Sequence, residues 1–250
     1  MNTHRTRRLL AGCILSCCAI QSASAGVVVG ATRVIFEEKQ REASVPIKNA
    51  DKSPFVVQAW VDTAAESDQK KAPFFVTPPL SRLDPGKENL LRIMRTRSNL
   101  PTDRESVFGM NIKEIPEASD KQNVLQIAIH TRIKLFYRPA GLEGNAAEAA
   151  QKLSWQLVPA EGGKGLALRV HNPTPFHVTF ASVKLNGAAH EDLDLETAPP
   201  LTDVSYPVKS LKAIPAQPLS VSFQTINDYG ATGNAAQAEV RSGAAAAKTD

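Results

Sequence analysis

The stretch from Leu125 to Pro139, LQIAIHTRIKLFYRP, restricts the fold more than any other part of the chain. Apolar side chains occupy nearly every second position from Leu125 to Tyr137, and most polar ones fall between them. This alternation is typical of a β-strand with one buried face. It would extend for about 40 Å, whereas most strands have about 5–6 residues. The sequence therefore predicts a strand longer than one domain needs.

Short apolar runs separated by turn signals fill the rest of the chain, without a long stretch of 3.6-residue period. A tight turn is expected at residues 84–86, Asp-Pro-Gly, where proline presets φ and glycine accepts positive φ. Strands at this spacing indicate antiparallel β-sandwiches. Besides residues 123–138, we expect strands at Thr32–Phe36, Ala43–Asn49, Phe55–Asp62, Phe74–Thr77, Glu88–Arg95, Ser106–Ile115, Leu153–Pro159, Gly165–Asn172, His177–Leu185, Asp203–Pro207 and Leu219–Asn227.

The stretch AGLEGNAAEAA after Pro139 has the small, flexible composition of a linker, and it divides the chain in two. We expect one sandwich domain at residues 26–139 and a second at residues 140–230. Residues 231–250 are rich in alanine and glycine and have little to bury. We therefore expect a disordered tail there.

The first 25 residues have the pattern of a secretory signal peptide, with three arginines, an apolar run and the small residues Ala23-Ser24-Ala25. We expect export and cleavage after Ala25. A lipoprotein signal is the alternative, because Leu10–Cys13 is similar to a lipobox, but few apolar residues separate Arg8 from Cys13. The apolar run is also shorter than the roughly 20 residues of a transmembrane helix.

Removal of this leader changes the composition of the chain. The formal charge falls from +4 to +1, because the leader carries three arginines and no acidic residue. Nucleic-acid binding then loses its compositional support. All three cysteines, Cys13, Cys17 and Cys18, also lie in the leader, so the mature chain is expected to fold without a disulfide.

The mature chain offers little sign of catalysis. It has no GxSxG elbow, HExxH motif or P-loop, and no local cluster of cysteines or carboxylates accompanies His171 and His177. We therefore expect neither an enzyme nor a metal site. A hydrolase that uses one of these histidines and a secreted sandwich that binds carbohydrate are the alternatives. Trp60 and Trp155 lie in apolar strand patterns, which indicate burial rather than a sugar-binding platform.

Several motifs in a fixed order resemble the periplasmic chaperones of the chaperone–usher pathway, which assemble pili. The resemblance covers nearly the whole mature chain. It implies two immunoglobulin-like β-sandwich domains set at an angle with a cleft between them, without enzymatic activity, cofactor or metal. The motifs are GATRVIF, FFVTPPLSRLDPGKENLLRI, LPTDRESVFGMNIKEIP, IKLFYRP, LRVHNPTPFHVTF and INDYG.

The same resemblance implies that the protein binds pilus subunits in the periplasm and delivers them to an outer-membrane usher. Each subunit is an incomplete sandwich, and the chaperone completes it with a donor strand at about residues 123–138. The donor side chains would be Leu125, Ile127 and Ile129. An unpaired apolar edge is also compatible with a self-capping homodimer of the free protein.

Other site residues follow from the resemblance alone. Arg33 and Lys134 match two cleft cations that bind the C-terminal carboxylate of the subunit. A second set, Glu105, Arg138 and Asp228, matches an interdomain charge cluster that orients the domains. The polar stretch PEASDKQN is short and the mature chain lacks cysteine, which places the sequence in the class with a short loop before the donor strand.

Overall fold

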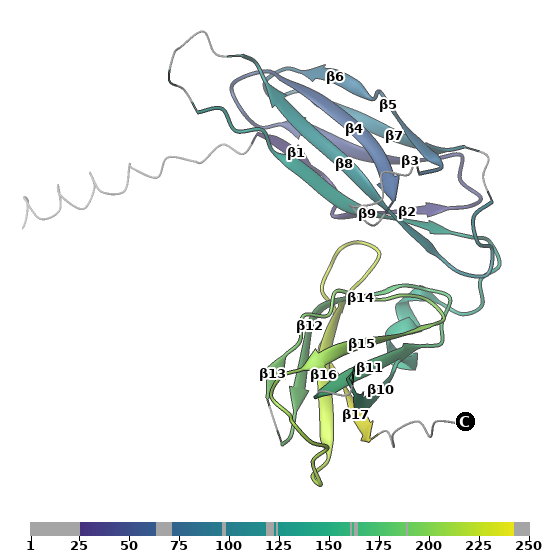
Figure 1. Cartoon of the computed structure of the whole chain (residues 1–250). Helices are drawn as coiled ribbons and strands as arrows, with labels where there is room; N and C mark the ends of the chain where they lie inside the picture. Colours follow the sequence, from purple (N-terminus) through teal and green to yellow (C-terminus); the bar gives the residue numbers. More distant parts are fainter. Residues whose placement is uncertain are drawn as a thin grey trace, which may run out of the picture.

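The computed structural model describes residues 26–63, 72–96, 99–118, 123, 125–160, 162, 165–188 and 190–242. Figure 1 shows two all-β domains that follow one another along the chain. The expected signal peptide lies outside the described residues. Within the described ranges, no helix is long and apolar enough to cross a membrane.

The N-terminal domain is a sandwich of two sheets (Figure 1). One sheet has the strand order β1-β3-β7-β5 and the other has the order β2-β9-β8-β4-β6. The strands are β1 Val27–Val29, β2 Arg33–Glu37, β3 Glu42–Asn49, β4 Phe55–Thr63, β5 Phe74–Thr77, β6 Leu80–Leu83, β7 Glu88–Arg95, β8 Ser106–Pro116 and β9 His130–Arg138.

Alternate side chains of these strands form a core between the two sheets. Aromatic rings lie at its centre, where Phe74 contacts Phe36 at 5.4 Å and Phe108 at 5.1 Å between ring centroids. Both pairs have edge-to-face geometry, which stabilises aromatic contacts beyond the area that they bury. The expected sandwich is therefore present in this half of the chain.

The C-terminal domain begins with a 3₁₀ helix, η2, at Ala146–Lys152, where the sequence indicated only a linker. Its sheet has the order β13-β12-β16-β17-β10-β11-β15, and β14 pairs with β12. The strands are β10 Ser154–Pro159, β11 Leu166–Asn172, β12 Val178–Asn186, β13 Glu191–Asp192, β14 Thr197–Ala198, β15 Thr202–Val208, β16 Leu219–Ile226 and β17 Ala236–Ser242.

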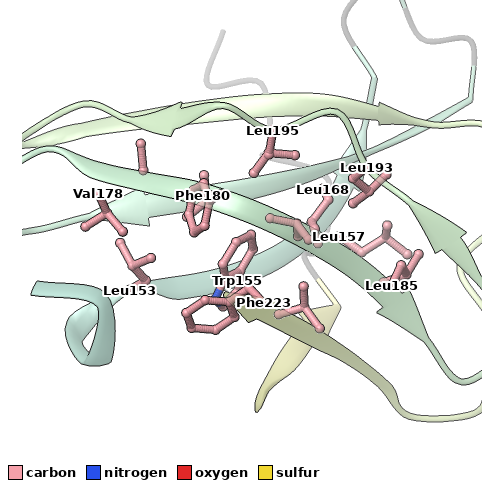
Figure 2. Packing of buried hydrophobic residues seen from close by; sticks show 14 of the residues in the cluster. Leu153, Trp155, Leu157, Leu168, Val178, Phe180, Leu185, Leu193, Leu195 and Phe223 are labelled. Atoms are coloured by element: carbon pink, nitrogen blue, oxygen red, sulfur yellow. The ribbon is translucent and has the colours of Figure 1, made fainter. Parts of the chain in front are cut away.

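The core of this domain gathers around Trp155 (Figure 2). Its indole lies 5.7 Å from the ring of Phe180 and 5.4 Å from that of Phe223. Side chains of β10 and β11 thus pack against those of β12 and β16, so the two halves of the sheet face each other. Each domain thus has its own aromatic centre, and the described residues of both domains contain no cysteine.

The strand that the sequence predicted at residues 123–138 is shorter in the structure. β9 begins at His130, and its Ile133, Leu135 and Tyr137 are buried as the alternation predicted. Residues 125–129 are not part of a strand, because the register of β8 with β9 ends at His130 and only the Glu114 N–H continues it, to the Ile129 carbonyl. Residues 125–129 of the predicted strand therefore form a segment that has no neighbouring strand in the described part of the chain.

The expectation of a disordered tail from residue 231 is wrong for Ala236–Ser242. These residues form β17, which pairs antiparallel with β16 and parallel with β10. Ala238 and Val240 also pack against the core of the C-terminal domain. Composition missed this strand because alanine has low β-propensity, and the strand is stabilised by backbone hydrogen bonds to β16 and to the distant β10.

We predict that ending the chain after Ala235 destabilises the C-terminal domain, since the edges of β16 and β10 then lose their common partner. Thermal unfolding of the purified protein should show a lower melting temperature and more aggregation. A chain ending after Ser242 keeps β17 and is the control. Equal melting temperatures for the two chains would contradict the structural role of β17.

Candidate functional site

A cluster of charges joins the two domains around the guanidinium of Arg138, at the end of β9. Its Nε donates a 2.7 Å hydrogen bond to Glu105, which precedes β8. Its two terminal nitrogens bind the carboxylate of Asp228, in the loop after β16, at 2.8 and 3.1 Å. The structure thus brings together three predicted residues that are far apart in sequence.

The pKa of Arg138 reflects this enclosure. Burial by itself lowers the pKa, but the hydrogen bonds and charges of Asp228 and Glu105 outweigh burial and raise it above the usual value. The side chain of Glu105 is only 2 % exposed. The cluster is therefore a largely desolvated ion network rather than a surface salt bridge.

Two further members of the cluster were missed by the sequence analysis. His177 donates its backbone N–H to Glu105 at 2.8 Å, and its Nδ1 lies 3.2 Å from the same carboxylate. Glu37 lies beside Arg138 in the register of β2 with β9 and contacts it at 3.2 Å. The register of β2 with β9 supplies Glu37, and the contact between the two domains supplies His177, so no local motif indicates either residue.

Arg33 and Lys134 are direct neighbours in the parallel register of β2 with β9, and both line one pocket against the C-terminal domain. Lys134 Nζ donates to the hydroxyl of Thr197 at 2.9 Å and lies 3.9 Å from the exposed Glu196. Burial lowers the pKa of Lys134, Glu196 opposes this change, and the nearby charge of Arg33 lowers the pKa further. The two cations therefore lie side by side at the boundary between the domains.

The polar atoms of this pocket are incompletely satisfied within the described residues. Arg33 donates to the carbonyl of Ile226 at 3.2 Å through one terminal nitrogen, but its buried Nε has no hydrogen-bond partner. The hydroxyl of Thr179, which lines the same pocket, is also buried without a partner. Buried donors of this kind cost about 1–3 kcal/mol each unless an acceptor reaches them.

The predicted donor side chains point into solvent. Leu125 is 84 % exposed, Ile127 is 68 % exposed and Ile129 is 48 % exposed. β2 accompanies β9 only from Lys134 onward, whereas β8 accompanies it from His130. The structure therefore presents three aliphatic side chains along an edge that no described strand covers.

The point where this segment leaves the sheet is held by aromatic and polar contacts. The ring of His130 stacks on Trp60 at 5.2 Å between centroids, and its Nε2 lies 2.9 Å from the buried amide oxygen of Asn111. The expectation of burial is confirmed for Trp155, but Trp60 is only half-buried, on the outer face of β4. Its partner there is a histidine of the same domain.

The histidines do not form a common site. His171 is exposed and pairs with Asp203 at 2.5 Å, whereas His177 is buried against Glu105. Among the described residues there is no group of three or more histidine, cysteine or acidic side chains that could hold a metal ion.

Comparison with known proteins agrees with this architecture. Residues 26–143 match the family described as pili and flagellar-assembly chaperone, PapD N-terminal domain, and residues 148–237 match the pili assembly chaperone PapD, C-terminal domain. The probable fimbrial chaperone YadV of Escherichia coli K12 is 40 % identical over 236 residues, which cover 90 % of this chain and 95 % of that protein.

Solved structures show the same likeness. The crystal structure of the YadV chaperone has a TM-score of 0.74 and 37 % identity, and the match covers 86 % of this chain and all of that one. The SafB chaperone of Salmonella enterica, solved in complex with the SafA pilin, has a TM-score of 0.72 and 31 % identity, with 86 % and 96 % of the two chains covered.

The two immunoglobulin-like domains and these matches define the class of the protein as a periplasmic chaperone, which is not an enzyme. The chain belongs to the PapD-like family of pilus-assembly chaperones of the chaperone–usher pathway.

We predict that Arg138→Ala lowers the free energy of unfolding by about 3–5 kcal/mol, because it leaves Glu105 buried without its cation. Urea unfolding followed by tryptophan fluorescence measures this change. Arg104→Ala is the matched control, since Arg104 pairs with Asp103 at the surface, and its loss should have no measurable effect. Equal effects of the two substitutions would contradict the importance of the buried cluster.

Proposed function

We propose that this protein binds pilus subunits in the periplasm by donor-strand complementation and delivers them to an outer-membrane usher. The observation that carries the proposal is the exposed, uncovered segment Leu125–Ile129, which leads directly into β9. The similar chaperone SafB was solved in complex with a pilin, which supports a pilus subunit as the partner of this protein.

The segment has the properties that strand donation requires. An incomplete subunit needs a strand that supplies backbone hydrogen bonds and alternate apolar side chains. Leu125, Ile127 and Ile129 lie two residues apart and would face one side of an extended strand, while Gln126, Ala128 and His130 would face the other. Burial of each aliphatic side chain would contribute about 1.5–3 kcal/mol before the cost of ordering.

Arg33 and Lys134 are proposed to bind the C-terminal carboxylate of the subunit. Such a carboxylate can accept charge-assisted hydrogen bonds from Lys134 and from the unsatisfied Nε of Arg33. Glu196 would compete for Lys134, but its carboxylate is exposed and its contact with the Lys134 ammonium is long, at 3.9 Å. Its displacement therefore costs little. This anchor also fixes the register of the added strand, because a shift by one residue would turn every side chain to the wrong face.

The remaining parts of the proposal concern assembly and maturation. The cluster of Glu105, Arg138 and Asp228 holds the two domains in one orientation, so that Lys134 keeps its position against the C-terminal domain. The signal peptide is cleaved after Ala25, and the short, polar sequence PEASDKQN before the donor segment supports membership of the short-loop class. In the free protein, a second copy can cover the apolar edge as a capping homodimer.

Arg33→Ala and Lys134→Ala should each leave a folded protein that no longer accumulates complexes with its subunit, because the carboxylate loses one of its two cations. Co-purification from the periplasm with a coexpressed subunit measures this loss. Lys113→Ala, on the exposed face of β8, is the control. Normal yields of complex from both variants would refute the carboxylate anchor.

We expect Ile127→Asp to reduce complex formation by at least about tenfold, because a carboxylate would have to enter an apolar groove. The same change should not lower the melting temperature of the free chaperone, since Ile127 is exposed. Leu80→Asp, at a similarly exposed position on β6, serves as the control. If Leu80→Asp and Ile127→Asp reduce the yield equally, the donor assignment fails.

A further inference from the structure

Glu114 places a carboxylate inside the N-terminal domain, near the start of its first strand. The residue is on β8 and is only 4 % exposed. Its Oε2 accepts a 2.6 Å hydrogen bond from the backbone N–H of Val27, the first residue of β1. Since β8 and β1 belong to different sheets, this contact joins the two layers of the sandwich.

No cationic side chain of the described residues forms an ion pair with Glu114. A carboxylate loses most of its hydration on burial, and one neutral N–H donor does not replace it. Buried charges in proteins are normally paired, so we expect a positively charged group beside the Glu114 carboxylate.

Gly26 shows where that positive group can come from. The residue is buried, and its carbonyl accepts a 3.0 Å hydrogen bond from Ala50. A Cβ atom at this position would lie 2.5 Å from Oε2 and 2.7 Å from Oε1 of Glu114, so any larger residue would displace this carboxylate. Because the Gly26 nitrogen is bonded to the same Cα, covalent geometry places it within about 5 Å of the carboxylate.

We propose that removal of the leader places the new α-ammonium group of Gly26 against Glu114 as a buried ion pair. This inference rests on the proposed cleavage after Ala25. Hydrolysis of that peptide bond by water leaves a carboxylate on Ala25 and an amine on Gly26, which takes up a proton near neutral pH. In the precursor the same nitrogen is an uncharged amide, so the pair forms only after processing.

The ion pair would also connect maturation to the subunit-binding edge. The backbone N–H of Glu114 donates to the carbonyl of Ile129 at 3.0 Å, at the point where the donor segment leaves the sheet. Glu114 thus contacts the mature N-terminus through its side chain and the donor segment through its backbone. Cleavage of the leader would therefore neutralise the charge of Glu114, the residue whose backbone N–H binds the donor segment.

A double-mutant cycle tests the pair in full-length protein purified from the periplasm. One change is Glu114→Gln, and the other is one alanine inserted after Ala25, which displaces the amine by one residue. Each change alone should lower the melting temperature by at least about 5 °C, and both together should lower it no further. Glu117→Gln, which removes an exposed carboxylate of the same region, should leave it unchanged.

Two measurements keep the outcomes distinct. Intact mass identifies the mature N-terminus, and a start other than Gly26 would refute the cleavage site and with it the source of the amine. If the chain begins at Gly26 but the two changes act additively, the ion pair alone is refuted. Acylation of the α-amine by an N-hydroxysuccinimide ester should be at least about tenfold slower in the native protein than in the alanine-insertion variant, even if Glu114→Gln fails to fold.

Discussion

A largely buried ion network around Arg138 joins the two domains. One planar guanidinium binds Glu105 of its own domain and Asp228 of the other. Geometry of this kind tolerates little rotation of one domain against the other, because the bidentate contact is directional. Lys134 lies four residues earlier on the same face of β9, in the pocket that Arg33 and Lys134 line against the C-terminal domain.

The sequence was informative wherever the signal is local. Alternation predicted the burial of Ile133, Leu135 and Tyr137, and turn residues bounded most strands to within one or two positions. The proximity of Glu105 to Asp228 could not come from periodicity, because it depends on how two domains meet. The family motifs predicted this cluster, which local patterns could not. They did not predict His177, which binds Glu105 through its backbone N–H.

The errors have a common physical origin in strand pairing. An apolar, alternating segment such as Leu125–Ile129 has every local property of a strand, but a strand forms only beside a partner. Ala236–Ser242 also alternates, with Ala236, Ala238 and Val240 between polar residues, but its apolar side chains are small and mostly of low β-propensity. It is a strand because β16 and β10 offer it edges on both sides. In both cases the neighbours decide the conformation, and the sequence of the segment does not name them.

This dependence on neighbours also explains why an exposed apolar edge is compatible with a stable free protein. The two domain cores are complete without Leu125, Ile127 and Ile129, so the exposed segment Leu125–Ile129 contributes little to folding. Other edges are blunted, since β6 has only four residues and the edge strand β15 contains Pro207. Leu125–Ile129 carries neither proline nor charge, and an edge left open in this way is suited to pairing with another chain.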